Sequence, residues 1–208
     1  MFFSMFLKAL SDIWPMIFIF TIILISVRIL YLVINKKSFV FHKELLMLCF
    51  IVYILLLYYT VTFQDNNYGT NNFVPFKEIF RYNITSRLFI RNVLGNILLF
   101  IPFGIFTTYI IKNKTVFPSM FLGLLVSSAI EFAQSAIGRT ADIDDIILNT
   151  VGSALGYLIY HIFIKFSYKL PSFVKKDLFL DLFSIIIVFL VLYMIYKFSV
   201  GGLIGWIM

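Results

Sequence analysis

Stretches of about 20 apolar residues recur along the whole of this 208-residue chain, and they constrain its fold more than any other feature. A helix of about 20 residues, rising about 1.5 Å per residue, crosses the hydrocarbon core of a bilayer. With 62% hydrophobic and 13% charged residues, the chain has too few polar side chains to cover a soluble globule of this size. The sequence therefore predicts an all-α fold, a polytopic bundle of transmembrane helices.

Six apolar runs are long enough to span a membrane. In the first run, Pro15 is expected in the first helical turn and Arg28 is expected to reach the interface near Asn35. In the third run, Pro102 and Gly104 predict a kink or local break near Ile101. The predicted spans are residues 13–34, 44–63, 92–111, 116–137, 143–164 and 178–196.

One long polar connection, residues 64–91, separates the second and third spans and opens on the polar stretch Gln64–Asn67. After Pro75, its apolar and basic residues recur on different helical faces, which predicts an amphipathic helix lying in the plane of the membrane interface. The apolar residues are Phe76, Ile79, Phe80 and Ile84, and the basic residues are Lys77, Arg81, Arg87 and Arg91.

The distribution of basic residues predicts the orientation of the chain. One set of alternate connections carries nine lysines, and the opposite side carries seven basic residues, four of them in the long connection. The positive-inside rule places the lysine-rich side in the cytoplasm, so that both termini and the polar motifs face outside. The nine lysines are Lys36, Lys37, Lys43, Lys112, Lys114, Lys165, Lys169, Lys175 and Lys176.

Polar residues gather between Arg91 and Gly156, inside or beside apolar runs. A charge at mid-membrane costs about 2.5 to 3.5 kcal/mol on insertion scales, so such residues indicate a functional site by default. Helical spacing places Asn92 and Asn96 on one face, and Ser127, Ser128, Glu131 and Gln134 on another. Amides can instead serve only to hold helices together. A carboxylate in an apolar run must be protonated, paired or hydrated, and we expect Glu131 to meet Asn92 or Asn96 rather than Arg139.

The segment from Arg139 to Gly156 gives the sharpest local pattern. A helix beginning near Asp142 would place Asp142, Asp145, Asn149, Gly152 and Gly156 along one stripe. In the structural interpretation, aspartate caps the helix and the two glycines permit close helix packing. In the functional interpretation, the aspartates bind Arg139 and the basic residues of 77–91, or coordinate a hard cation such as Mg²⁺ or Ca²⁺. No histidine lies nearby and the spacing matches no known calcium loop, so neither a metal nor a cofactor is predicted.

Other function classes find little support in the sequence. The net charge of +7 is scattered through the connections, which suits anionic lipid headgroups rather than nucleic acid. His42 and His161 fall at predicted cytoplasmic ends of spans, the single Cys49 lies within an apolar run, and no Gly-x-Ser-x-Gly motif is present. Acyl-transfer chemistry is therefore not supported.

Several motifs in a fixed order resemble those of a known family. They are Asn72–Phe76, Asn92–Asn96, Phe100–Gly104, Glu131–Gln134, Asp142–Asp145, and Asn149–Gly152 with Gly156. In this order they resemble the VanZ-like family of bacterial membrane proteins, named for an accessory protein of glycopeptide resistance. The resemblance covers roughly residues 72–160 of a single membrane domain over residues 1–208. The span at 13–34 is then an addition before this core, and the span at 178–197 follows it.

This resemblance implies a multi-pass protein of the bacterial cell membrane and cell envelope. The protein for which the family is named lowers susceptibility to the lipoglycopeptide teicoplanin. The resemblance implies no settled biochemical activity. The leading hypothesis is a protein, not necessarily an enzyme, that binds an amphiphile at the outer leaflet, such as a lipid headgroup, a lipid-linked wall precursor or a lipoglycopeptide. Alternatives are a membrane enzyme that acts on a lipid phosphate through an aspartate-bound divalent metal, and a structural partner of a larger envelope complex. The oligomeric state is left open.

The predicted ligand-binding residues combine arginines for an anionic group with carboxylates and amides that shape a polar pocket. They are Arg87, Arg91, Asn92, Asn96, Glu131, Gln134, Arg139, Asp142, Asp145 and Asn149.

Overall fold

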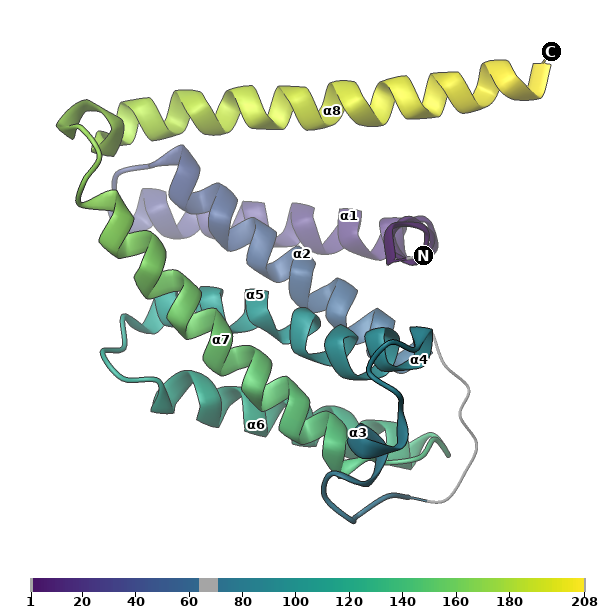
Figure 1. The fold of residues 1–208 in the computed structure, drawn as a ribbon. Helices are drawn as coiled ribbons and strands as arrows, with labels where there is room; N and C mark the ends of the chain where they lie inside the picture. Colours follow the sequence, from purple (N-terminus) through teal and green to yellow (C-terminus); the bar gives the residue numbers. More distant parts are fainter. Residues whose placement is uncertain (1, 64–70, 208) are drawn as a thin grey trace. The chain divides into compact units, whose positions relative to one another are not determined.

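The computed structural model describes the backbone of residues 2–63 and 71–207, and the side chains of residues 13–59, 71–191 and 193. The predicted polar opening of the long connection, Gln64–Asn67, lies outside the described residues. Figure 1 shows the fold as a series of helices. In the described part of the chain there is no strand, only one isolated parallel bridge between Asn72 and Asp142.

The all-α prediction is confirmed, because every apolar run has become a helix (Figure 1). Five of these helices are long and apolar enough to cross a membrane, and their span limits lie within a few residues of the predicted ones. The protein is therefore a polytopic membrane protein. The long helices are α1 (Phe2–Ile34), α2 (Phe41–Phe63), α5 (Gly95–Ile111), α6 (Phe117–Ala136), α7 (Ile143–Ser167) and α8 (Asp177–Ile207). The short elements are α3 (Lys77–Arg81), α4 (Arg87–Phe89), the π-helical η1 (Ile90–Leu94) and the 3₁₀ turn η2 (Ser172–Lys175).

Two details of the predicted spans are wrong. Pro15 does not lie in a first turn, since α1 begins at Phe2 and carries this proline in its interior. Of the kink or local break expected near Ile101, the break is absent, because α5 runs as one helix through Pro102. The irregular turn lies earlier, at η1. The predicted sixth span, residues 178–196, falls within α8.

The predicted amphipathic helix is shorter than its apolar periodicity indicated. α3 contains five residues, so Ile84, Arg87 and Arg91 do not lie on it. The chain turns after Arg81 because Asn83 accepts hydrogen bonds through its Oδ1 from the N–H and the hydroxyl of Thr85. Ser86 then accepts the N–H of Phe89 and caps α4. These local side-chain bonds compete successfully with a continuous helix.

Backbone contacts divide the chain into two compact units. The first comprises Met1–Ile19 and Phe50–Phe166, and the second comprises Phe20–Cys49 and Ser167–Met208. In the first unit, Leu57, Phe100 and Phe103 form a buried apolar cluster between α2 and α5, which is extended by partly buried residues of α6. The Tyr53 hydroxyl donates to the Leu99 carbonyl at 2.6 Å beside this cluster.

Small residues allow α5, α6 and α7 to lie side by side (Figure 1). A Cβ atom on Gly152 or Gly156 would lie 2.3 or 2.2 Å from a carbonyl oxygen of α5, and one on Gly104 would lie 2.1 Å from the Ser153 carbonyl of α7. On α6, a Cβ on Gly123 would collide with the Ser153 hydroxyl. The prediction that Gly152 and Gly156 permit close packing is therefore confirmed, and α5 is the main partner helix.

Polar side chains also hold together the end of this three-helix bundle where α5 connects to α6. The Thr108 and Ser119 hydroxyls are 2.8 Å apart and fully buried. Asn113 Nδ2 donates to the Ser119 hydroxyl and to the Thr115 carbonyl, and the Tyr157 hydroxyl donates to the Lys114 carbonyl. The short connection is thereby tied to all three helices.

In the second unit, ionic contacts join the connections between helices. Asp181 of α8 accepts both the backbone N–H of His42, at 2.8 Å, and its imidazole, at 2.7 Å. The Lys43 ammonium lies 3.3 Å from Asp177. Arg28 of α1 donates to both carboxylate oxygens of Glu44, at 2.7 and 3.0 Å. Arg28, predicted as a simple interfacial anchor, therefore has a specific partner in α2.

Candidate functional site

We call the end of the first unit where α6 connects to α7 its polar end. The chain leaves α6 there through Gly138. Gly138 has a φ of 82°, in the left-handed region that only glycine adopts at little cost. The N–H of Gly138 donates to the Ser135 carbonyl and the N–H of Arg139 donates to the Gln134 carbonyl, which together form a Schellman motif. This motif turns the chain sharply and leads it through Arg139 to the start of α7.

The segment before α3 is fastened to the start of α7 by main-chain bonds. The Asn72 N–H donates to the Ala141 carbonyl at 2.9 Å, and the Ile143 N–H donates to the Asn72 carbonyl at 3.0 Å. The Asn72 side chain is buried, donates to Asp142 Oδ1 at 2.9 Å and accepts the N–H of Val74. Two segments that are 70 residues apart in the sequence therefore form one unit of structure.

Asp144 fixes the first turn of α3 to α7. Its side chain is 1% exposed, and its Oδ1 accepts the N–H of Phe76 at 2.5 Å. Its Oδ2 accepts the N–H groups of Glu78 and Ile79 at 2.7 and 3.2 Å. A buried carboxylate with three backbone donors satisfies its charge while it caps another helix. The positive φ of Phe76, 67°, aims these donors at Asp144.

Asp142 caps α7, as the structural interpretation of this motif predicted. Its Oδ1 accepts the N–H of Asp144 at 2.9 Å, two residues further along the chain. Burial raises the pKa of this carboxyl above its usual value, and the negative charges of Asp144 and Glu78 act in the same direction. The hydrogen bonds from the Asp144 N–H and from Asn72 oppose this rise.

Glu131 has a different partner from the one predicted. Its side chain is 4% exposed, and its Oε2 accepts the backbone N–H of Asp142 at 2.8 Å. The prediction that Glu131 pairs with Asn92 or Asn96 is therefore wrong. The side chains of these two asparagines donate elsewhere, Asn92 to the Tyr82 hydroxyl at 3.0 Å and Asn96 to Asp145 Oδ1.

The π-helical turn explains why the side chains of Asn92 and Asn96 have different partners. Asn92 lies within η1 and Asn96 follows it in α5. A π-helical turn contains an extra residue, so the four-residue spacing no longer places both side chains toward one partner. Asn92 consequently belongs to the surface network of Tyr82, Glu78 and Arg81, in which the Tyr82 hydroxyl and Arg81 Nη1 both donate to Glu78.

The predicted stripe along α7 faces the other two helices of the bundle. Asp145 accepts from Asn96 of α5, and Asn149 Nδ2 donates to the Ser127 hydroxyl of α6 at 2.8 Å. Gln134 is buried on the same face of α6 as Ser127 and Glu131. The α7 stripe therefore contacts α5 through Asp145 and the polar face of α6 through Asn149.

The three arginines among the predicted ligand-binding residues lie at or near this end but differ in burial. Arg87 is exposed at the start of α4, whereas Arg91 and Arg139 are half-buried. Arg139 is close enough to interact electrostatically with both Glu131 and Asp145. The structure thus brings Arg139, Asn96, Glu131, Asp142 and Asp145 together, and it places Arg87 and Asn92 outside this buried group.

Sequence reasoning missed the residue that organises the site. Asp144 was part of the recognised acidic motif but not among the predicted ligand-binding residues, and Asn72 was only part of a family motif. The sequence did mark both residues, Asp144 as an aspartate in the first turn of a predicted helix and Asn72 as an asparagine shortly before Pro75. In the described residues there is no group of three or more His, Cys, Asp and Glu side chains arranged to hold a metal ion.

A profile of the VanZ/LLP1 family matches residues 45–164, which is more than half of the chain. The chain belongs to the VanZ/LLP1 family. The matched region begins in α2 and ends in α7, so it contains most of the second span, the whole polar end and nearly all of the three-helix bundle. The recognised motifs from residue 72 to residue 156 all lie within it.

Among curated proteins, this family member is similar to Protein VanZ of Enterococcus faecium. The two are 39% identical over 72 residues, which are 34% of this chain and 44% of the relative. The chain thus aligns with less than half the length of that relative. No solved structure matches the chain.

Proposed function

We propose that this protein binds an amphiphile at the outer leaflet of the bacterial cell membrane, and that through this binding it contributes to resistance to lipoglycopeptides such as teicoplanin. The ligand class is a lipid headgroup, a lipid-linked wall precursor or the lipoglycopeptide itself. Membership of the VanZ/LLP1 family supports the link to resistance. One feature of the polar end supports the link to an amphiphile.

This feature is the amphipathic surface that surrounds the segment held by Asp144. Large apolar side chains are exposed beside cationic ones, and Phe80 has 82% of its surface accessible. Such a mixture suits a ligand that carries both an acyl chain and an anionic head. The exposed apolar residues are Phe73, Val74, Phe76, Phe80 and Ile84, and the exposed cations are Lys77, Arg81 and Arg87.

The carboxylates form the support of the proposed site rather than its contact surface. Asp142, Asp144 and Asp145 each accept hydrogen bonds from within the protein, as does Glu131. Arginine is the side chain best suited to hold a phosphate or carboxylate group through two parallel hydrogen bonds. In the proposal, Arg87, Arg91 and Arg139 bind the anionic group, and the acidic residues hold Arg139 and the Asn72–Tyr82 segment in place.

Drug susceptibility in a host that expresses the variants tests this function. Arg87→Gln should reduce protection against teicoplanin, which carries an acyl chain, while membrane abundance remains unchanged because Arg87 is exposed. Lys114→Gln is the matched control, since it removes one exposed charge at the opposite end of the bundle. If the Arg87→Gln and Lys114→Gln variants protect equally against teicoplanin, the role of Arg87 is rejected. If the protein protects against a glycopeptide without an acyl chain as well as it does against teicoplanin, the amphiphile is rejected as the ligand.

Orientation is tested separately by cysteine labelling in a Cys49→Ala background, because Cys49 is exposed. Cysteines at Asn67 and Thr140 should react with an impermeant reagent in intact cells. Cysteines at Asn113 and Ser172 should react only after permeabilisation. The inverted pattern would place the polar end in the cytoplasm and would exclude a site at the outer leaflet.

A further inference from the structure

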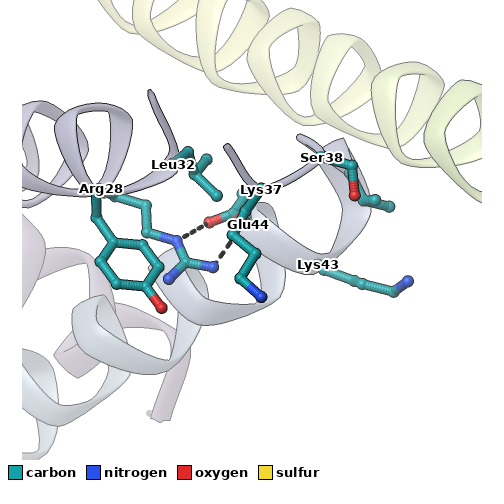
Figure 2. A pocket seen from close by; sticks show the side chains of 8 residues that line it. Arg28, Leu32, Lys37, Ser38, Lys43 and Glu44 are labelled. Atoms are coloured by element: carbon teal, nitrogen blue, oxygen red, sulfur yellow. Dashed lines mark hydrogen bonds and ion pairs between the residues drawn. The ribbon is translucent and has the colours of Figure 1, made fainter. Parts of the chain in front are cut away.

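A pocket of about 340 Å³ lies in the second unit, where α1 connects to α2. Figure 2 shows Arg28 and Glu44 pointing toward one another within it. Its volume lies at the lower end of the range of about 300 to 1,000 Å³ found for ligand pockets. It is lined by Arg28, Tyr31, Leu32, Lys37, Ser38, Val40, Lys43 and Glu44.

The lining of this pocket is cationic, because it contains three basic side chains and one carboxylate. Arg28 uses its Nε and one Nη2 hydrogen toward Glu44, and a guanidinium has five N–H donors, so further donors remain. The Lys37 ammonium has no partner in the described part of the chain. Lys43 shares its charge with Asp177 at 3.3 Å and is half-exposed, so it is free to turn toward an anion.

The position of the pocket along α1 corresponds to the headgroup level of a membrane. The apolar span runs from Ile13 to Ile34, and Arg28 lies six residues before its end, about 9 Å along the helix axis. Leu32, Val40 and Tyr31 add an apolar wall beside the cations. Basic pockets between transmembrane helices at this level bind the headgroups of anionic lipids.

We infer that this pocket binds a phosphate group, and that its place at the membrane boundary selects the phosphate of an anionic phospholipid headgroup. Arg28, Lys37 and Lys43 hold the phosphate oxygens. Ser38 and Glu44 offer acceptors for headgroup hydroxyls, which distinguishes a polyol headgroup such as that of phosphatidylglycerol from a choline headgroup. The site involves none of the residues proposed for the amphiphile site, so either proposal can fail alone.

Thermal unfolding and native mass spectrometry of the purified full-length protein in detergent test this inference. Phosphatidylglycerol should raise the melting temperature more than phosphatidylcholine does and should remain bound in the spectrometer. Lys37→Gln should weaken phosphatidylglycerol binding about fivefold, the effect of removing one interfacial charge. Lys37 is exposed, so the variant should fold normally, which circular dichroism would verify.

Lys114→Gln is the control for general surface charge and should leave lipid binding unchanged. The assignment is overturned if Lys114→Gln weakens binding as much as Lys37→Gln, or if the two lipids stabilise the protein equally. Inorganic phosphate forms a separate arm. If it matches the stabilisation by phosphatidylglycerol at equal concentration and the effect disappears in Lys37→Gln, the ligand is a soluble phosphate and the lipid assignment is overturned.

Discussion

α1 and α5 are both long apolar helices, yet they use their side chains in different ways. In the most apolar 18 residues of each span, 6% are buried in Ile13–Ile34 of α1 and 33% in Arg87–Ile111, the span that ends with α5. α1 exposes large residues such as Trp14, Phe18 and Ile23, whereas α5 buries Gly95, Gly104, Thr107 and Thr108. Apolar character is thus shared, and it is the small and polar residues that mark the helix which packs against protein.

A second comparison concerns Asp144 and Asp181, which differ in burial. Each accepts a backbone N–H from the first turn of another helix. Asp144 is buried and accepts three N–H groups of the α3 segment. Asp181 is partly exposed and accepts one N–H of α2 together with the His42 imidazole. A buried carboxylate has no water to replace its partners, so the α3 segment should depend on Asp144 more than α2 depends on Asp181.

The largest expected effect is the loss of close packing between α5 and α7. Gly156→Leu would drive its side chain into the Ile101 carbonyl and the Gly104 backbone, so we expect a cost of at least about 3 kcal/mol and a strong loss of membrane abundance. Ser26→Leu on exposed α1 is the matched change and should be tolerated. Comparable membrane abundance of the two variants would show that the packing of α5 against α7 is no more sensitive to a large side chain than exposed α1 is.

The second effect concerns the attachment of α3. Asp144→Ala removes three charge-assisted hydrogen bonds and should cost about 3 kcal/mol, chiefly by releasing the segment. Trypsin should then cleave faster after Lys77 and Arg81, and the amides of Phe76, Glu78 and Ile79 should exchange faster with deuterium. Asp181→Ala should leave these amides protected. Unchanged exchange in Asp144→Ala would show that other contacts hold α3.

A smaller effect is expected at Glu131. Glu131→Gln keeps an acceptor for the Asp142 N–H and should leave membrane abundance nearly unchanged. Glu131→Leu leaves that buried N–H without its acceptor and should cost about 1 to 3 kcal/mol. Teicoplanin susceptibility measured beside abundance separates structure from function. Full protection by the glutamine variant would retire any functional need for the charge.

The smallest effect is a pH dependence from Asp142, whose pKa is raised in the folded state. A raised carboxyl pKa means that the folded protein binds the proton more tightly than the unfolded chain, so this contribution is fully present below the unfolded pKa and is lost as pH rises through the folded pKa. Asp142→Asn should therefore gain stability relative to wild type as pH rises above the unfolded pKa of about 3.9. Melting temperatures of both proteins across this range measure the difference, and parallel curves would contradict it.

Span positions were predictable because each depends on a local property, the length of an apolar run. The inward stripe of α7 was also predictable, since helical geometry alone relates Asp145, Asn149 and Gly152. The partners of Glu131 and Asp144 were not, because both carboxylates bind backbone N–H groups, which every residue carries and no sequence pattern marks. The shortness of α3 likewise depended on local hydrogen bonds of Asn83 and Ser86 that hydropathy does not report.

The bond between Phe76 and Asp144 joins residues that are 68 positions apart. A ribosome adds about 5 to 20 residues each second, so roughly 3 to 14 s pass between synthesis of the α3 segment and synthesis of the aspartate that receives it. During this interval the segment lacks the carboxylate that accepts three of its backbone N–H groups in the folded protein. The α3 segment can therefore take up its final position only after the first turn of α7 has been synthesised.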